Sequence, residues 1–446
     1  MTIANKKISM LSAVALCMLL AFFAAGQPKD QIFYQVVSIV PLILILTLLF
    51  LQVDMLVAAL AGGCMSMIIG GIGIATANQV MLKEIPGMLG VTVPIINSAI
   101  ATAVFKAGGY TAALTLVRRA IGDRTEYLGA FVVILLAAAT YMSGIGGASA
   151  MVIAPLAFAA VGVVPGVIAG MSIAAAMSFT TSPASLETSV VAKQTGIDAA
   201  VYVSTMQPFW LMFCVIAIVI AFVDAKRKKG MFKGEENEDM KKLSNADLWK
   251  LTAPAIFLLF AVIAGPAVNK FFGSPVLGPM MYSIITIFLI YVCSHFTLNQ
   301  SSMAMIEGST YILTRLFAVG IFVAFVRIIE MTGAFNTIAH VVQAAPNVAY
   351  VPVAVFIGYL IGVPAGAYVG SILALILPVT VTLGFTPIQT GLVVMGVGLG
   401  SQMSPVNITM QALSAGFQIP VLQVSRGNAP YILGCLVLLM AIAFFV

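Results

Sequence analysis

Two stretches of sequence decide the fold: AAAMSFTTSPASLETSVVAKQTGI at 174–197 and GVGLGSQMSPVNITMQALSAG at 396–416. Each is apolar on both sides of a Ser-Pro pair, Ser182-Pro183 in the first and Ser404-Pro405 in the second. Proline removes a backbone N–H and interrupts a helix, so each stretch predicts a helix broken inside an apolar run. Such a break is tolerated at membrane depth only where it is buried in protein or lines a cavity.

The composition of the whole chain is that of a membrane protein. Of 446 residues, 61% are hydrophobic and 8% are charged, and the mean hydropathy is +1.11. An ordinary soluble domain carries about 25% charged residues, so this composition excludes soluble enzymes and nucleic-acid binders. The apolar runs are continuous rather than alternating, which excludes a membrane β-barrel. We therefore expect an all-α polytopic membrane protein with about 11 transmembrane helices, since each span needs roughly 20 apolar residues.

The two halves of the chain match at one fixed offset, the one that separates Ser182 from Ser404. At this offset Pro165 corresponds to Pro387 and Ile197 corresponds to Ile419. Pro155 corresponds to Pro378 with a shift of one position. Several matches at one offset, in the same order of spans and breaks, predict an internal repeat.

An interrupted apolar run precedes each broken helix. Residues 127–164 are interrupted at Ser143–Ser149, and residues 346–384 near Pro364–Gly370. We interpret each run as a re-entrant hairpin, with tips near Gly146 and Gly366. Each half then has an odd number of crossings, so the repeats are inverted, which is typical of secondary transporters. The alternative is that each hairpin crosses the membrane fully twice. The number of crossings in each half is then still odd, so the repeats would still be inverted.

The charge distribution predicts the domains and their orientation. We expect an extra N-terminal helix at 1–26, a first repeat at 27–223, a cytoplasmic linker at 224–250 and a second repeat at 251–446. With the N-terminus in the cytoplasm, 14 of the 21 Lys and Arg residues lie inside, as the positive-inside rule requires. The first helix also has the pattern of a signal peptide, but we expect it to be retained. The expected location is the inner (plasma) membrane.

The four breaks form the candidate substrate site. Half-helix N-termini attract anions, while freed carbonyls attract cations. We therefore expect an anionic substrate near the membrane midplane, with Na⁺ or H⁺ as the coupling ion and no cofactor. The candidate substrate-binding residues are glycines and small polar residues at the breaks: Ser143, Gly146, Gly147, Ser149, Thr181, Ser182, Ser185, Gly366, Ser371, Ser404, Asn407 and Thr409.

Charged residues inside apolar runs are costly unless they are functional or paired. Arg315 lies at the centre of 304–326, and it is either a substrate ligand or half of a structural pair with an acid such as Glu307. Glu187 lies beside the first Ser-Pro break and is a candidate ion-coupling residue; a helix-end residue that faces water is the alternative. Lys106 and Arg327, at the ends of spans, should reach toward the membrane surface.

The hairpins and broken helices together resemble the ion transporter superfamily, which includes divalent anion/sodium symporters and anaerobic C4-dicarboxylate (Dcu-type) transporters. The hairpin sequences YMSGIGGASAMVIAPLAFA at 141–159 and GVPAGAYVGSILALILPV at 362–379 carry this likeness. The Ser-Asn-Thr tips of the sodium/dicarboxylate branch are absent, and the Dcu-type branch is closer. The resemblance covers nearly all of the chain after the first helix. It implies a secondary transporter of small organic anions, such as succinate, fumarate and malate, by exchange or cation symport.

Other interpretations stay open at this stage. Sodium/proton antiporters and gluconate-type permeases share the same scaffold, and a channel or a structural membrane subunit is a third class. The chain has no Walker loop and no hydrolase motif, so we expect neither an enzyme nor a nucleotide-driven pump. The expected partners are the organic anion and the lipid bilayer, with a homodimer as a further option and no nucleic acid.

Overall fold

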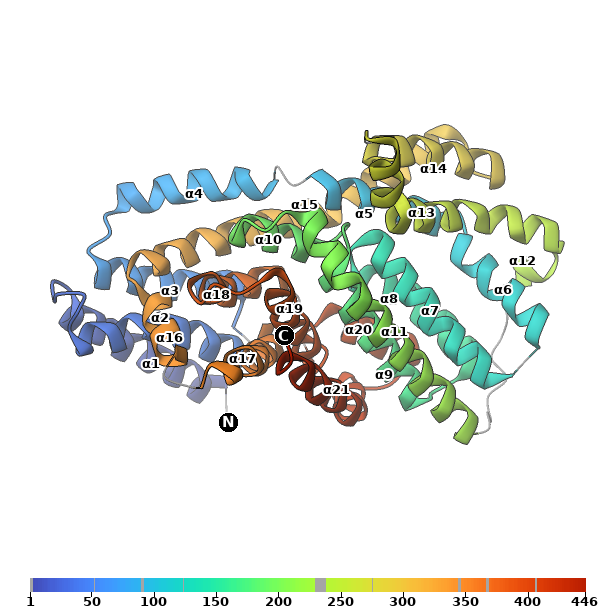
Figure 1. Cartoon of the computed structure of the whole chain (residues 1–446). Coiled ribbons are helices and arrows are strands. Elements are labelled where there is room, and N and C mark those ends of the chain that lie inside the picture. Colours follow the sequence, from blue (N-terminus) through green and yellow to red (C-terminus); the bar gives the residue numbers. More distant parts are fainter. Residues whose placement is uncertain are drawn as a thin grey trace.

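The computed structural model describes residues 3–51, 53–89, 92–122, 124–228, 238–274, 276–343, 346–365, 369–405 and 407–446. Within these ranges the chain forms helices and no strands (Figure 1). The first half contains α1 (Ile3–Ala24), α2 (Ile32–Phe50), α3 (Met55–Gly70), α4 (Ile74–Leu89), α5 (Thr92–Lys106), α6 (Gly109–Ile121), α7 (Thr125–Ser143), α8 (Gly146–Val161), α9 (Pro165–Thr181), α10 (Leu186–Thr195) and α11 (Ala199–Lys228).

The second half follows the same order after a short helix, α12 (Glu238–Lys241). It contains α13 (Asn245–Phe272), α14 (Pro279–Cys293), α15 (Leu298–Met331), α16 (Ala334–Gln343), the 3₁₀ turn η1 (Asn347–Ala349), α17 (Tyr350–Ala365), α18 (Val369–Thr382), α19 (Pro387–Ser401), α20 (Ile408–Phe417) and α21 (Val421–Ala443).

The helices are those of a polytopic membrane protein. Among the described residues, five helices are long and apolar enough to cross a bilayer, and the count is seven if α4 with α5 and α9 with α10 are each one bent span. Seven further apolar helices are 10–17 residues long, shorter than the roughly 20 residues of a full span. The total of about 11 crossings therefore stays a prediction.

The amphipathic helix α4 starts at Ile74 and packs against α15. Its buried residues, Ala77, Glu84 and Met88, share the face that packs against α15. At the two ends of the expected linker, α11 continues to Lys228 and Ser244 caps a helix that begins at Asn245. The cytoplasmic linker at 224–250 stays a prediction.

Helices of the first half pack against helices of the second half. The helices α9, α10 and α11 precede α19, α20 and α21 at the same fixed offset along the chain, from Pro165 to Pro387. In space, α8 packs against α20 while α18 packs against α10, and α6 packs against α13 while α16 packs against α2 (Figure 1). Each half therefore covers the other half's interrupted helices. The repeat boundaries and the inversion in the membrane stay predictions.

The first parts of the broken helices form the centre of the molecule. In α9 every residue from Gly166 to Thr181 is buried, and in α19 every residue from Thr390 to Ser401 is buried. A helix that is apolar all round belongs in such a core. Glycines allow the close packing: a Cβ added at Gly170 would lie 2.7 Å from the carbonyl oxygen of Ala217 on α11.

Candidate functional site

The first hairpin turns at Gly144 and Ile145, between α7 and α8. Gly144 has a φ of +72°, a left-handed conformation that glycine adopts without the steric cost of a side chain. The tip therefore lies two residues before the position expected near Gly146. Gly366, the expected tip of the second hairpin, lies outside the described residues.

The tip of the first hairpin lies directly against the first break. A Cβ added at Gly144 would be 2.2 Å from the carbonyl oxygen of Ala184. The Ser182 hydroxyl donates to the carbonyl of Tyr141 at 2.5 Å and accepts from the amide of Ala184 at 2.9 Å. These contacts fix the hairpin to the break, and they occupy the Ser182 proton in this state.

Ser143 and Ser149, on opposite sides of the tip, are brought together as the sequence suggested. Their hydroxyl oxygens lie 3.2 Å apart, and the oxygen of Ser143 accepts from the amide of Ile145 at 3.1 Å. Both side chains are buried. Thr181 does not join them, because its hydroxyl donates to the Met177 carbonyl in its own helix at 2.7 Å.

The start of α8 faces the start of α20, in the other half of the chain. A Cβ added at Gly146 would lie 3.1 Å from the Thr409 hydroxyl oxygen, and one at Gly147 would lie 2.5 Å from Cγ2 of Ile408. The side-chain oxygen of Asn407 caps α20 by accepting from the amides of Thr409 and Met410, at 2.8 and 3.2 Å. Among the described residues, no side chain caps the start of α8. The first-turn amides of α8 therefore lie at this junction without a side-chain acceptor.

The start of α18 faces the start of α10 in the corresponding way. Glu187, in the first turn of α10, is 9% exposed, and the backbone of Gly370 lies beside its carboxylate. A Cβ added at Gly370 would lie 3.2 Å from Cγ of Leu186. The hydroxyl of Ser185 caps α10 by accepting from the amide of Thr188 at 3.1 Å. Glu187 is therefore buried against the second hairpin rather than facing water.

Several polar atoms near the breaks are buried and have no hydrogen-bond partner among the described residues. The hydroxyls of Ser371 and Ser404 and the side-chain carbonyl of Gln402 are in this group, and all three residues are at most 1% exposed. Native proteins rarely leave such atoms unsatisfied, so each one is a candidate contact for a water, an ion or a ligand. Gln402 was not among the expected site residues, although it lies only two positions before Ser404 and is polar in an apolar run.

The charged residues of α15 are paired with its neighbours. Glu307 forms an ion pair with Lys106 of α5, and Arg327 pairs with Glu330 at 2.6 Å and with Glu84 of α4 at 3.9 Å. Lys106 and Arg327 were expected to reach toward the membrane surface. Because α4 and α5 pack along α15, both side chains form ion pairs with acidic residues. The side chain of Arg315 lies outside the described residues, so its two interpretations stay open.

Comparison with solved structures supports the fold. No protein-family model matches the chain, and no curated protein matches it. The crystal structure of the YdaH transporter from Alcanivorax borkumensis, described as having an unusual topology, matches with a TM-score of 0.55 and 15% identity. The match covers 84% of this chain and 89% of that one. The chain shares its fold with a membrane transporter.

Within this transporter fold, the contacts bring four helix starts together in two pairs. The starts of α8 and α20 meet at Gly146 and Thr409, and those of α10 and α18 meet at Glu187 and Gly370. The hairpin tip at Gly144 joins the pairs, because it lies against the break between α9 and α10. Helix N-termini carry partial positive charge. Ser185 and Asn407 already accept from amides of α10 and α20, so α8 is the start at which backbone amides can meet an anion.

Proposed function

We propose that the chain is a secondary active transporter of small organic anions, with C4-dicarboxylates as the first candidates, working by cation symport or anion exchange. The observation that supports it best is the meeting of helix starts from both halves in the buried centre of a transporter fold. A membrane-spanning chain gains nothing structurally from broken helices at its core, whereas a transporter needs their backbone groups.

The chemistry of the site suits a carboxylate. A dianion leaves water only where several donors replace its hydration shell. The uncapped amides at the start of α8, the hydroxyls of Ser371, Ser404 and Thr409, and the amide of Asn407 are the donors at these breaks. Glycine at 146 and 147 lets the start of α8 approach Thr409 and Ile408 of α20 closely, which brings its amides to the junction of the two halves. Within this proposal the Dcu-type likeness suggests succinate, fumarate and malate.

Access to the site has a candidate route beside the other ends of the same helices. A hollow of about 600 Å³ lies between the loop after α8 and the start of α21. Its lining includes Arg426, Gln423 and Asn428, and a positive group there would favour the approach of an anion. Asn428 is anchored to the core, since its amide donates to the hydroxyl of Ser172 at 2.7 Å.

Glu187 is the proposed coupling residue. It is an acid buried at the junction of α10 with the second hairpin, and its equivalent position in the second half holds Thr409, which is uncharged. One of the two helix junctions therefore carries an ionisable group and the other does not. Buried acids at membrane depth commonly serve proton or sodium coupling, and this asymmetry suits a single coupling ion.

A sodium/proton antiporter is the second candidate, and the burial of Glu187 is the observation that favours it. Such an exchanger would need this acid but would not need the uncapped amides of α8 or the glycines at its start. A gluconate or monocarboxylate permease would use the same donors with a different anion.

Flux measurements in proteoliposomes test these candidates together. Labelled succinate uptake is measured with and without internal succinate, a sodium gradient or a pH gradient, and labelled gluconate is measured in parallel. Succinate uptake above that of protein-free liposomes is expected. If neither anion enters, while a sodium gradient drives proton movement, the antiporter replaces the proposed function.

A further inference from the structure

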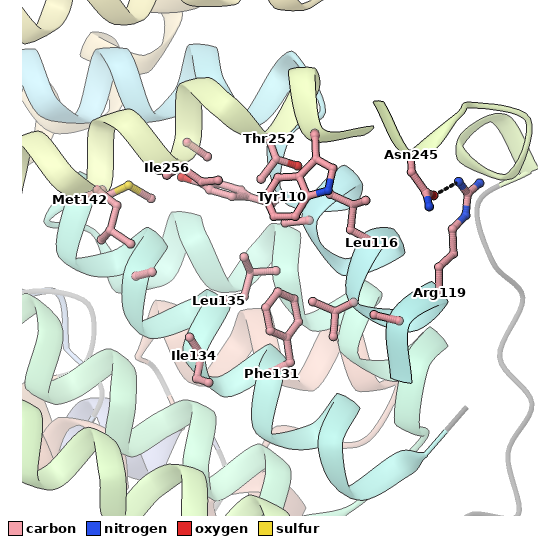
Figure 2. Close-up of a pocket in the computed structure, with 17 residues that line it drawn as sticks. Tyr110, Leu116, Arg119, Phe131, Ile134, Leu135, Met142, Asn245, Thr252 and Ile256 are labelled. Carbon is pink, nitrogen blue, oxygen red and sulfur yellow. Dashed lines mark hydrogen bonds between the residues drawn. The ribbon is translucent and has the colours of Figure 1, made fainter. Parts of the chain in front are cut away.

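A second pocket lies between α6, α7 and α13 (Figure 2), and Met142 at one end of it directly precedes the interruption at Ser143–Ser149. Its volume is about 450 Å³, within the range of about 300–1,000 Å³ that is usual for ligand pockets. The walls are almost entirely apolar: Leu116 comes from α6, Phe131 and Leu135 from α7, and Ile256 from α13. An apolar pocket of this kind suits an acyl chain better than a small dianion, because between its ends only the hydroxyls of Tyr110 and Thr252 are polar.

The pocket opens onto apolar surface rather than toward the core. Ile134 is 44% exposed, Ile256 49% and Trp249 59%, and all three line the pocket. In a membrane protein, exposed apolar side chains of this kind face lipid. An acyl chain of the bilayer can therefore enter the pocket without crossing the protein surface.

One end of the pocket is polar. Arg119 lies there and donates to the carbonyls of Leu243 at 2.9 Å and Met240 at 3.2 Å, and to the side-chain oxygen of Asn245 at 2.8 Å. Figure 2 shows Arg119 and Asn245 at this end and Met142 at the opposite end. The contacts hold the guanidinium at the mouth of the pocket, where it can meet a phosphate.

The segments around the polar end carry both basic and acidic residues, and the acids include Asp239 and Asp247. Arg118 precedes Arg119, and the exposed Lys242 and Lys250 come from the segments that flank Asn245. Lys250 is 4.0 Å from Asp247, an acid on its own helix. Trp249 lies beside this end, and tryptophan is enriched at the level of lipid headgroups. Basic pockets between membrane helices bind anionic lipid headgroups.

We propose that this pocket binds an anionic phospholipid, with one acyl chain between α6, α7 and α13 and the phosphate at Arg119. The lipid would join the two halves of the chain, since α6 and α7 belong to the first half and α13 to the second. It is separate from the transported substrate, because none of its lining residues belongs to the helix breaks.

Lipid retention by the purified full-length protein tests the proposal. The protein is delipidated, offered phosphatidylglycerol or phosphatidylcholine with the same acyl chains, and the bound lipid is counted by native mass spectrometry. Phosphatidylglycerol should be preferred. Ala138→Phe, which fills the pocket wall, should weaken its binding about tenfold, which corresponds to about 1.4 kcal/mol. Val219→Phe, at an exposed position of α11 outside the lining, is the matched control and should bind normally.

Two further arms separate the headgroup from the chain. Arg119→Gln should bind both phospholipids equally, and neither glycerol phosphate nor oleate alone should displace bound phosphatidylglycerol at the concentration at which the intact lipid does. Equal retention of phosphatidylcholine by the unmodified protein, or normal binding by Ala138→Phe, would overturn the proposal. If Arg119→Gln does not fold, the Ala138→Phe comparison decides the question on its own.

Discussion

Replacing Gly144 with alanine tests the contact between the first hairpin and the first break. Two costs add at this position. The φ of +72° is unfavourable for any residue with a Cβ, by about 1–2 kcal/mol. The new Cβ would also lie 2.2 Å from the carbonyl oxygen of Ala184 and 2.6 Å from Cα of Ser185. Overpacking of this kind costs typically about 1–3 kcal/mol, so the free energy of unfolding should fall by about 2–5 kcal/mol in total.

Gly196 supplies the matched control for this change. Its φ is +73°, and a Cβ added there would meet nothing within 4 Å. Gly196→Ala should therefore lose only the backbone cost of about 1–2 kcal/mol. The difference between the two variants isolates the close approach of the hairpin tip to the break.

The two variants are compared by reversible unfolding in detergent and by succinate uptake in proteoliposomes. Gly144→Ala should lose more stability than Gly196→Ala. Its substrate affinity should fall by roughly 5- to 100-fold, since about 1–3 kcal/mol of distortion falls at the site. Gly196→Ala should transport normally. Equal losses of stability and equal transport in the two variants would show that the tip does not depend on this contact.

The remaining predictions concern the cap of α20, the coupling residue and the orientation. Asn407→Ala should raise the KM for the anion by roughly 5- to 100-fold, because a donor to a charged group contributes about 1–3 kcal/mol. Thr386→Ala, which removes the cap of α19 at an exposed end, should lose similar stability and keep its KM. Glu187→Gln should abolish the dependence of uptake on a proton or sodium gradient while exchange of labelled for unlabelled anion continues, and unchanged gradient dependence would contradict the coupling role. A cysteine at Lys242 in a cysteine-free background should react with impermeant thiol reagents only in inverted vesicles; labelling of intact cells would reverse the predicted orientation.

The sequence alone carries much of the fold. The Ser-Pro pairs at 182 and 404 lie between helices in the structure, as their proline chemistry predicts. The turn at Gly144 and Ile145 adjoins the tip expected near Gly146, but the pattern of small residues does not say which glycine takes the left-handed conformation.

The contacts between the two halves could not be predicted from the sequence. A repeat at a fixed offset predicts equivalent helices, but it does not say that α8 packs on α20 rather than on α10. The pairing of Lys106 with Glu307 depends on the same information, since the residues are far apart in the chain. Gln402 could have been found from its polarity alone, whereas the burial of Glu187 depends on the position of Gly370.

The packing of first-half helices against second-half helices has a consequence for biogenesis. When α8 leaves the ribosome, its partner α20 has not yet been made. At synthesis rates of about 5–20 residues per second, that partner emerges roughly 10–50 s later. During this interval the first hairpin's glycine-rich tip has no α20 to shield it from lipid. The nascent chain therefore has to be protected by the insertion machinery until its last helices enter the bilayer, and premature termination before Asn407 should send the product to proteolysis.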